Sequence, residues 1–386
     1  MSPSDGHVLV VAGEPSGDLH AGRLLEALAG EMPGLRAVGM GGEAMRKAGA
    51  EIIHDYGSLA VVGISDFPRV LPVLRRIKRD LLNQVRERRP RAVILVDYPG
   101  FNLSFAKALK KLQNPPRLIY FIPPQVWAWG SGRARTIARI FDLVLTIYPF
   151  EPSYFTRSGG QAEYTGNPVA FGLRNRPTKR EARASLGIPQ DAQVVSFLPG
   201  SRLKEIERHI PPMEEAVRIL KERCPEVLYL ISEAGAIPEG TIRNALSSEE
   251  EGIRVIRGRQ HEVIRAADAA AVASGTATLE TGLLGTPMII IYIVELVTYL
   301  LAMYFLVRVD YIGLVNLLAG REVAPELHQG KVRGRRIADL LSSLLEDPDA
   351  RQRQIQAFDE IRDFLAGPDP YARAAGRIRQ FLEGAP

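Results

Sequence analysis

Cysteine is nearly absent from this sequence, which has only Cys224 among its 386 residues. A single cysteine excludes an internal disulfide framework and suits a reducing cytoplasm. The first residues lack the basic stretch and apolar run of a secretory signal, so we expect none. Repeats of roughly 20 to 50 residues and low-complexity segments are also absent. With 46% hydrophobic and 24% charged residues, the chain is predicted to fold into two domains.

Charge is nearly balanced over the whole chain, at +5, but not over one segment. Residues 69–91 contain nine Arg or Lys and two acids, a net charge of +7, so the rest of the chain carries −2. This local excess favours an anionic partner at one face over general binding of nucleic acid.

The same region has apolar residues at helical spacing beside its basic ones. This pattern predicts an interfacial helix on anionic lipid, with an amphipathic surface helix packed on a sheet as the alternative. The proline residues at 68 and 72 limit where the helix begins. The side chains expected at the membrane are Phe67, Val70, Leu71, Leu74, Arg75 and Arg76.

Apolar runs of strand length alternate with segments of helical length. This alternation predicts an α/β chain with two Rossmann-like domains, each on a parallel sheet, that face each other across a cleft in a GT-B arrangement. The predicted strands are Val8–Ala12, Arg36–Val38, Ala92–Val96, Leu118–Phe121 and Leu143–Ile147, then Val194–Leu198, Val227–Ile231, Arg254–Ile256, Ala269–Val272 and Pro287–Tyr292.

A stretch rich in Pro, Asn, Arg and Gly, residues 167–179, predicts the linker between the domains. We therefore expect a first domain over residues 1–170 and a second over 180–345. Residues 346–386 carry helical patterns only, and we expect these helices to pack back on an N-terminal domain.

The turn after the first strand carries three groups that are able to move protons. Gly13 and Gly17 allow the backbone to turn between strand and helix. Open α/β sheets bind ligands at such turns, beside the free N–H groups of a helix. Glu14, Asp18 and His20 cluster there, which favours proton chemistry over a plain structural turn.

A carboxylate also ends the buried run at residues 92–96. Asp97 is placed to accept a proton from a sugar hydroxyl, but it is equally suited to cap the following helix, as is Asn102. After the next strand, Trp127 and Trp129 share one loop. Paired indoles fit a wall for a sugar or acyl chain, with a plug of the core as the alternative.

Two strand-to-helix corners in the second half predict a site for a nucleotide diphosphate. Arg202 offers a planar fork for phosphate, and the small residues at 274–276 permit close approach to helix N–H groups. The alternatives are a structural cap and a tightly packed junction with a solvated acid. The expected diphosphate contacts are Gly200, Ser201, Arg202, Ser274, Gly275 and Thr276, with Glu280 at the ribose hydroxyls.

Residues 288–307 form a long apolar run that suggests a membrane span, but Glu295 interrupts it. A central acid costs about 2.5–3.5 kcal/mol on insertion scales. We therefore expect a buried strand at 287–292, followed by a helix from about Leu296.

Six segments occur in an order that resembles one family. They are GEPSGDLH at 13–20, DYPGFN at 97–102, PQVWAW at 124–129, LPGSR at 198–202, SGTATLE at 274–280 and NLLAGRE at 316–322. The chain resembles the lipid-A-disaccharide synthases, which are glycosyltransferases of lipopolysaccharide assembly. The resemblance implies transfer of 2,3-diacylglucosamine from its UDP derivative to 2,3-diacylglucosamine 1-phosphate (lipid X), with inversion and without a metal or other cofactor.

The resemblance also implies roles for individual residues. A carboxylate of the first domain takes the proton of the acceptor 6-hydroxyl, and the candidates are Asp97, then Glu14 or Asp18. The acceptor side includes Ser16, His20, Asn102, Gln125 and Trp127, and Asn316 joins the UDP contacts. A homodimer with exchanged C-terminal segments, and peripheral association with the inner face of the inner membrane, are also implied.

Several positions depart from the usual family pattern. Many relatives have Asp where Gly100 stands, and that Asp is a favoured candidate base, so its role is expected to fall to Asp97. Basic residues are replaced by Ile293, Met303, Tyr304 and Gly130, while Asn167 and Val315 replace His and Pro. The competing functions are another UDP-sugar enzyme of GT-B type, such as a 2-epimerase, and a non-catalytic UDP-sugar or lipid sensor.

Overall fold

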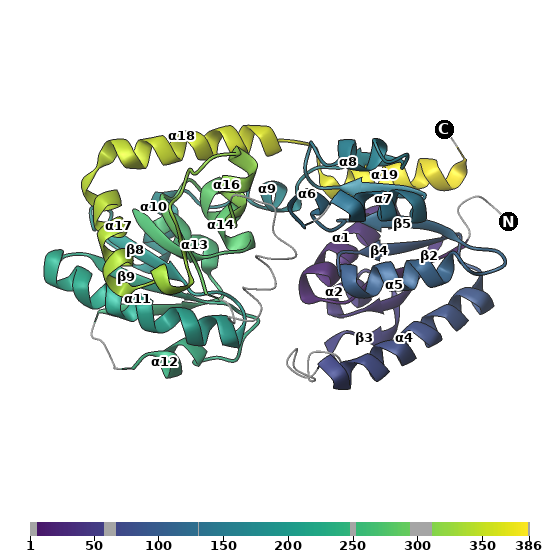
Figure 1. Ribbon diagram of the computed structural model, residues 1–386, viewed down its shortest axis with the longest axis horizontal. Helices are drawn as coiled ribbons and strands as arrows, with labels where there is room; N and C mark the ends of the chain where they lie inside the picture. Colours follow the sequence, from purple (N-terminus) through teal and green to yellow (C-terminus); the bar gives the residue numbers. More distant parts are fainter. Residues whose placement is uncertain (1–5, 58–66, 130, 248–251, 294–310, 385–386) are drawn as a thin grey trace. The chain divides into compact units, whose positions relative to one another are not determined.

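The computed structural model describes residues 6–57, 67–129, 131–247, 252–293 and 311–384. The chain divides into two compact units (Figure 1). The first unit takes in the chain up to Phe171 together with the segment from Ala366 onward, and the second is Gly172–Leu365.

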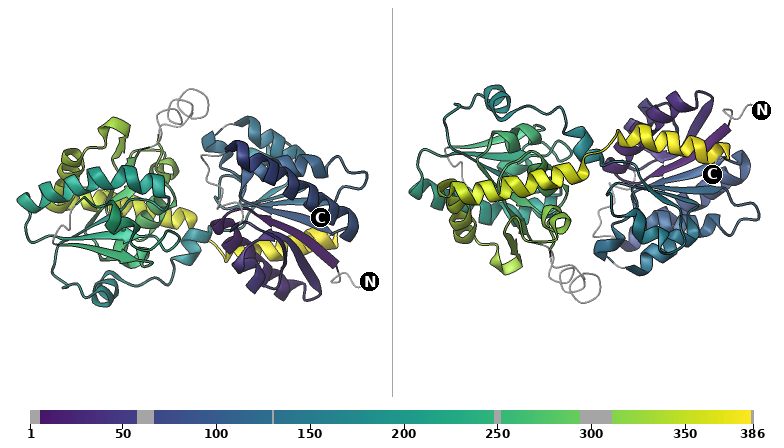
Figure 2. Two further views of the ribbon diagram at one scale, coloured as in Figure 1. Left: turned by 90° about the horizontal axis from the view of Figure 1, so that it is seen from below. Right: turned by 90° about the horizontal axis from the view of Figure 1, so that it is seen from above.

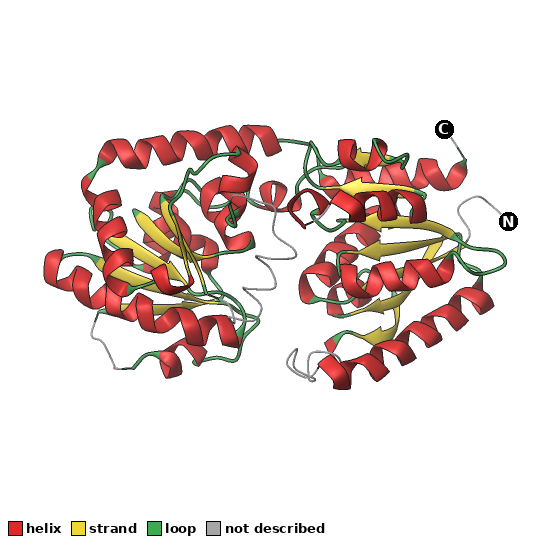
Figure 3. Ribbon diagram, viewed as in Figure 1, coloured by secondary structure: helices red, strands yellow, loops and turns green. Residues whose placement is uncertain are grey.

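A seven-stranded sheet forms the centre of the first unit, and every pair of neighbouring strands is parallel (Figure 3). Fully buried strands such as β4 are apolar at each position because helices cover both faces. The strand order is β3 (Glu51–Asp55), β2 (Leu35–Gly41), β1 (Gly6–Ala12), β4 (Ala92–Val96), β5 (Arg117–Phe121), β6 (Leu143–Thr146) and β7 (Ala162–Tyr164).

Alternate residues of the central strands build two separate cores. Val8 and Val10 pack with α1 (Pro15–Glu31), α2 (Glu43–Lys47) and α19 (Pro370–Glu383). Leu9 and Val11 face the other way, toward α4 (Phe67–Arg88), α5 (Pro99–Leu109) and α7 (Ser131–Ile140). The shorter helices of this unit are α6 (Val126–Trp129), α8 (Pro152–Thr156) and α9 (Pro168–Gly172).

The second unit has a parallel sheet of six strands, in the order β10 (Ile253–Arg257), β9 (Leu228–Glu233), β8 (Val194–Leu198), β11 (Ala269–Ala273), β12 (Met288–Tyr292) and β13 (Glu326–His328). One face packs on α11 (Leu203–Arg223), α12 (Thr241–Ala245) and α17 (Gly334–Glu346). The other contacts α10 (Lys179–Leu186) and α13 (Gln260–Ala266). The elements that remain are α14 (Thr276–Leu283), α16 (Leu314–Ala319), the short helix η3 (Gln329–Lys331) and α18 (Pro348–Leu365).

The predicted class, α/β with two Rossmann-like parallel-sheet domains, is confirmed, and each of the predicted strands overlaps an observed one. The sequence analysis missed β3, β7 and β13. All three are edge strands of only three to five residues, each contains a charged residue, and none has a continuous apolar run.

The helical tail is divided between the units. Helix α18 lies in the second unit, where it contacts α14 and α17, whereas α19 lies in the first unit and packs on α1 (Figure 2). Asp369 begins α19, because its carboxylate accepts hydrogen bonds from the backbone N–H groups of Tyr371 (2.8 Å) and Ala372 (3.1 Å).

The first part of the apolar run at 288–307 is strand β12, as predicted, and the helix expected from Leu296 lies outside the described residues. Among the residues that the structure does describe, no helix combines the length and hydrophobicity of a membrane span.

Candidate functional site

Each sheet reverses its direction of winding between two central strands. In the first unit these are β1 and β4, and in the second they are β8 and β11. Crevices at the carboxyl ends of such strands are where open α/β sheets bind ligands. Most of the site residues that the sequence predicts follow these four strands directly.

Asp97 follows β4 and has an unusual backbone conformation. Its φ is +48° and that of Tyr98 is +44°, so two consecutive residues with side chains occupy the left-handed region. Each such residue costs of order 1–3 kcal/mol and persists only where its surroundings hold it.

Two buried side chains hold this strained turn. The Asn102 amide donates hydrogen bonds from Nδ2 to the carbonyl oxygens of Val96 (3.2 Å) and Asp97 (2.7 Å). The Tyr120 hydroxyl donates to the same Asp97 carbonyl at 3.0 Å. Asn102 is fully buried, so the structure places it beneath the turn as a support for the backbone.

The Asp97 carboxyl is poised to exchange a proton near neutral pH. Burial and the neighbouring Glu14 carboxylate raise the pKa of Asp97 to about 6, against a partial offset from the Tyr98 backbone N–H. A general base works best when its pKa lies near the operating pH. The structure therefore brings together two of the three predicted catalytic acids, Asp97 and Glu14.

The loop after β1 approaches the loop after β4 closely at Gly13. A Cβ atom at Gly13 would lie 2.2 Å from Cδ1 of the Tyr98 ring, so any side chain there would displace the ring. Glu14 follows as the N-cap of α1 and is half-buried. The glycine at this position thus allows the acid after β1 to lie beside the acid after β4.

Asp18, the third predicted acid, has a structural environment. Its carboxylate accepts hydrogen bonds from the backbone N–H groups of Gly42 (2.7 Å), Ala44 (2.9 Å) and Met45 (3.2 Å). These are the first N–H groups of α2, which have no partner within the helix. Asp18 therefore joins α1 to the start of α2.

The two other polar residues predicted near this loop point in different directions. Ser16 is exposed at the start of α1. His20 packs under α19, where its Nδ1 lies 2.9 Å from the Tyr371 hydroxyl oxygen. Burial and the nearby Arg23 guanidinium lower the pKa of His20 to about 4, so the ring is neutral at pH 7.

Trp127 is fixed by a buried acid that the sequence analysis did not identify. Its Nε1–H donates to Glu151 at 2.9 Å, and the other Glu151 oxygen accepts from the N–H groups of Ile147 and Tyr148. Burial raises the pKa of Glu151 to about 7. Gln125 is half-buried just before α6, and the side chain of Trp129 lies outside the described part.

Helix α4 contains the side chains predicted to touch a membrane. Ile77, Leu81 and Val85 are buried against the sheet, and Leu74 packs partly buried on the same core. Leu71 is half-buried and Arg75 and Arg76 are exposed, while nothing is described of the Phe67 and Val70 side chains. The amphipathic alternative thus accounts for the helix from Leu74 onward, and the outward face is basic.

The loop after β8 in the second unit requires a glycine. Gly200 has φ +115°, and a Cβ atom there would lie 2.7 Å from Oε2 of Glu205. Ser201 and Arg202 are exposed, and the Arg202 guanidinium donates to Glu205 at 2.9 Å. This loop therefore presents a cation and little steric bulk at the start of α11.

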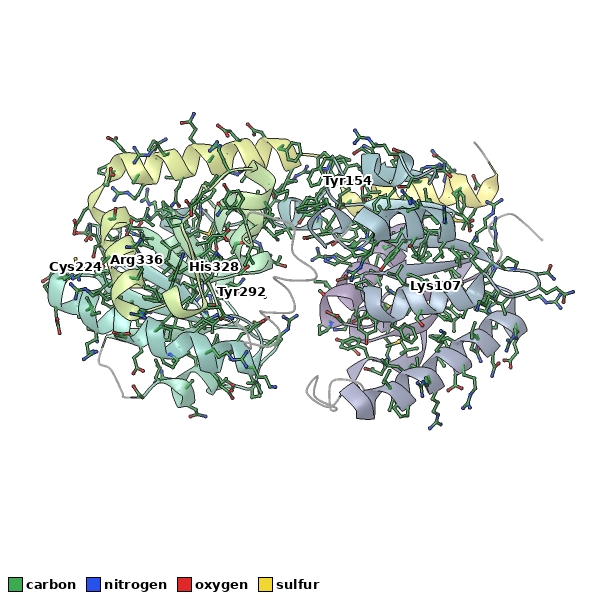
Figure 4. All side chains as sticks on the ribbon, in the orientation of Figure 1. Lys107, Tyr154, Cys224, Tyr292, His328 and Arg336 are labelled. Carbon is green, nitrogen blue, oxygen red and sulfur yellow. The ribbon has the colours of Figure 1, made fainter. Side chains whose placement is uncertain are left out.

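His209 ties this loop to the end of β12. Its Nδ1 lies 2.8 Å from the Pro199 carbonyl oxygen, and its Nε2 accepts a hydrogen bond from the Ile293 N–H at 3.1 Å. Tyr292, labelled in Figure 4, is the last residue of β12. Burial and the nearby Glu205 raise the pKa of Tyr292.

The loop after β11 is also built from small residues. Ser274 directly follows the strand, Gly275 has φ +145°, and Thr276 is exposed at the start of α14. Glu280, one turn further, accepts a hydrogen bond from Gln260 at 2.6 Å and lies 3.3 Å from His261. The structure thus brings the predicted diphosphate contacts to one edge of one sheet.

Asn316 differs from the other predicted UDP contacts because both polar atoms of its side-chain amide already form hydrogen bonds within the protein. Its Nδ2 donates to the Ala324 carbonyl (2.7 Å) and to Glu326 (2.8 Å), and its Oδ1 accepts from the Val323 and Ala324 N–H groups. It is fully buried. Asn316 therefore holds the segment that leads into β13.

No group of three or more His, Cys, Asp or Glu side chains suited to a metal ion occurs within the ranges that the structure describes.

Comparison with known sequences identifies the family. Residues 8–374 match the family model described as lipid-A-disaccharide synthetase. The chain belongs to the lipid-A-disaccharide synthetase family. Lipid-A-disaccharide synthases of Syntrophus aciditrophicus and Anaeromyxobacter sp. (strain K) are 40% and 39% identical to this chain, and the alignments cover 95–96% of this chain and 96% of each relative. Membership confirms the expectation of a glycosyltransferase of lipid A biosynthesis.

Solved structures with the same fold are more distant. A putative UDP-N-acetylglucosamine 2-epimerase from Listeria monocytogenes is 13% identical, with a TM-score of 0.64 over 99% of this chain and 97% of its own. A UDP-GlcNAc 2-epimerase from Neisseria meningitidis bound to UDP-GlcNAc is 12% identical, with a TM-score of 0.61 over 98% and 99%. These likenesses establish the GT-B fold of this lipid-A-disaccharide synthetase family member.

The sequence analysis missed the residues that act on backbone rather than on substrate. Tyr120, Glu151 and His209 are single polar residues within apolar or mixed segments, and each has a partner at least ten residues away, namely Asp97, Trp127 and Pro199. A pattern of neighbours in sequence gives no signal for such contacts. The left-handed turn at Asp97 has a weak signal, because aspartate is enriched among residues with positive φ.

Proposed function

We propose that this chain joins UDP-2,3-diacylglucosamine to 2,3-diacylglucosamine 1-phosphate (lipid X), releasing UDP and a β-1′,6-linked disaccharide 1-phosphate. The family supplies the class of reaction. The observation that carries the proposal is the Asp97 carboxyl, whose pKa of about 6 suits a base and which lies beside Glu14 at the crevice between β1 and β4.

In the proposed reaction Asp97 accepts the proton of the acceptor 6-hydroxyl. The oxygen then forms a bond to the anomeric carbon of the donor while the bond from that carbon to the diphosphate breaks. Attack from the face opposite the leaving group inverts the anomeric centre. The proton ends on Asp97 and the electron pair of the broken bond ends on UDP, so charge moves from the acceptor side to the diphosphate.

The second unit is suited to bind that diphosphate. Arg202 offers a guanidinium, and the N-terminal ends of α11 and α14 add positive potential beside small residues. Donors that are already in place stabilise charge as it develops on a leaving group without having to reorganise. A metal ion is not needed in this scheme, which uses only residues of the chain.

Membrane association belongs to the same proposal because both substrates carry acyl chains. The outward face of α4 exposes Arg75, Arg76 and Arg79, and basic residues near an anionic bilayer contribute about 1 kcal/mol each. Sedimentation with vesicles of phosphatidylcholine, with and without phosphatidylglycerol, tests this step. We expect binding that needs the anionic lipid and that weakens in high salt, and equal binding to both vesicles would contradict it.

The purified chain with both substrates tests the reaction. We expect disaccharide 1-phosphate and UDP in equal amounts, and formation of both products at least about 10²-fold slower in the Asp97→Asn variant. Absence of both products from the unmodified chain would refute the proposal. The 2-epimerase alternative rests only on fold likeness, and it predicts conversion of UDP-GlcNAc by a chain that ignores the lipid acceptor.

A further inference from the structure

We propose that the groove lined by α4, α5 and α7 in the first unit binds the phosphomonoester of the phosphorylated glycolipid acceptor. The inference rests on the proposed function and adds a subsite to it. The groove has a volume of about 530 Å³. Helix α5 supplies most of the lining residues and lies between the other two helices (Figure 1). The lining residues are Lys78, Pro99, Gly100, Leu103, Ser104, Lys107, Ala108, Lys111 and Arg133.

The position of the groove connects it to the candidate base. Pro99 and Gly100 form one end of the groove and directly follow the Asp97–Tyr98 turn in the chain. Gly100 is exposed, and a Cβ atom placed on it would meet nothing within 4 Å, so this end is open. The groove therefore begins two residues after the candidate base in the chain, and no side chain at residue 100 narrows it there.

One face of α5 runs from this opening toward the cations. Gly100, Ser104 and Lys107 recur at helical spacing, so they share one face, and Lys111 follows in the turn just after the helix ends. At 1.5 Å per residue, the distance along the helix from Gly100 to Lys107 is about 10 Å. Lys107, labelled in Figure 4, projects from this helix. The polar end of a sugar phosphate is short enough to lie within that span.

The charged residues that line the groove are all basic. Its lining contains four cations, namely Lys78, Lys107, Lys111 and Arg133, and no acid. Within the described ranges, no carboxylate forms an ion pair with any of them. Burial and the nearby Lys111 lower the pKa of Lys78, whose Nζ donates to the Ser104 hydroxyl at 2.9 Å. Cations without a carboxylate partner repel one another, and a bound dianion removes that repulsion.

A phosphomonoester fits these features better than other anions. It carries close to two negative charges and three acceptor oxygens at pH 7, which several ammonium groups and one guanidinium can satisfy together. The remaining lining is apolar, at Pro99, Leu103 and Ala108, and suits the carbon face of a sugar ring. A phospholipid headgroup or free inorganic phosphate shares part of this chemistry, so the experiment distinguishes these sources.

The test compares two double variants that remove equal charge. Lys107→Ala/Lys111→Ala alters the groove, and Lys47→Ala/Arg157→Ala removes two exposed cations elsewhere in the same unit. We expect the groove variant to raise KM for the 1-phosphate acceptor by at least about 10-fold, with KM for the UDP-sugar and kcat within about 2-fold. The control variant should match the unmodified chain.

An acceptor without its phosphate gives the decisive comparison. For 2,3-diacylglucosamine with a free 1-hydroxyl, the groove variant and the unmodified chain should have the same KM, because the interaction is already missing. An equal loss on both acceptors, or no loss on either, would overturn the inference. Lys107→Arg/Lys111→Arg should recover most of the affinity, which a merely structural role of the two side chains would not explain.

Binding measurements separate this inference from the proposed function and from the other phosphate sources. Phosphorus NMR with glucosamine 1-phosphate needs no turnover, and we expect binding that the groove variant loses even if no transfer is detected. Displacement by inorganic phosphate at equal concentration would assign the groove to free phosphate instead. A matching loss of binding to phosphatidylglycerol vesicles would assign it to the membrane, and either outcome would overturn the inference.

Discussion

The two units place opposite chemistry on the same topological position. In the first unit, the loops after β1 and β4 carry Glu14 and Asp97, and the Glu14 carboxylate helps raise the pKa of Asp97. In the second, the loops after β8 and β11 carry Arg202 and small residues such as Gly200 and Gly275. A parallel sheet with helices on both faces thus fixes where a ligand binds, while the loops decide which chemistry it meets.

The difference extends to how each loop is held. The first unit stores strain in a left-handed turn and supports it with Asn102 and Tyr120. In the second unit, the positive-φ positions of the two loops, 200 and 275, are glycines, so those turns cost little. A proton acceptor must be held in one position, whereas a diphosphate needs backbone that it can approach closely. The predictions below test this contrast.

Asp97→Asn should have the largest effect. Loss of a general base costs 10²- to 10⁴-fold, so we expect kcat to fall at least about 10²-fold with little change in the melting temperature. Asparagine keeps the size of the side chain and removes only its ability to take a proton. Steady-state kinetics with the lipid acceptor measure the change, and an unchanged rate would remove Asp97 from this role.

The pH dependence of kcat in the unmodified chain tests the same role of Asp97. A base must be deprotonated, so kcat should increase about 10-fold per pH unit below about pH 6 and level off above it, because the pKa of Asp97 is raised to about 6. The residual activity of the Asp97→Asn variant should not increase with pH over this range. If the increase of kcat with pH persists in the variant, a group other than Asp97 causes it.

Arg202→Ala should affect the donor rather than the acceptor. Hydrogen bonds to charged groups contribute about 1.5–3 kcal/mol, which corresponds to roughly a 10- to 100-fold rise in KM for the UDP-sugar. KM for the acceptor should stay within about 2-fold. Arg218→Ala, an exposed position on the same helix, is the matched control. A rise in both KM values would contradict the proposal that the second unit binds the donor and the first unit the acceptor.

Asn316→Ala should reduce stability. The substitution removes the side-chain oxygen that accepts from the Val323 and Ala324 N–H groups, at about 1–3 kcal/mol for each unsatisfied group. Thermal unfolding measures the loss, with the exposed Asn244→Ala as control. Unchanged melting together with a raised KM for the UDP-sugar would instead favour direct contact with UDP, as the family resemblance implied.

The sequence predicted the long buried strands and the loops that follow them because both depend on local patterns. Val8–Ala12 and Ala92–Val96 are apolar throughout, and the glycines and acids stand directly after them. It did not predict that Asp18 would bond the start of α2, or that His20 would pack under Tyr371 of α19. Those contacts join residues 24 and 351 positions apart, and nothing in the local pattern records them.

Glu14→Gln should have the smallest effect and the most specific one. The Glu14 carboxylate helps raise the pKa of Asp97, so a neutral amide should lower that pKa from about 6 toward its ordinary value of 3.8. The rise of kcat with pH should therefore occur at lower pH, while KM for the UDP-sugar stays unchanged. Asp18→Asn is the matched control, because its carboxylate faces the N–H groups of α2. If the pH range of this rise shifts equally in both variants, the shift reflects loosening of the unit. A shift in Glu14→Gln alone would establish that the two loops of the first unit act as one acid pair.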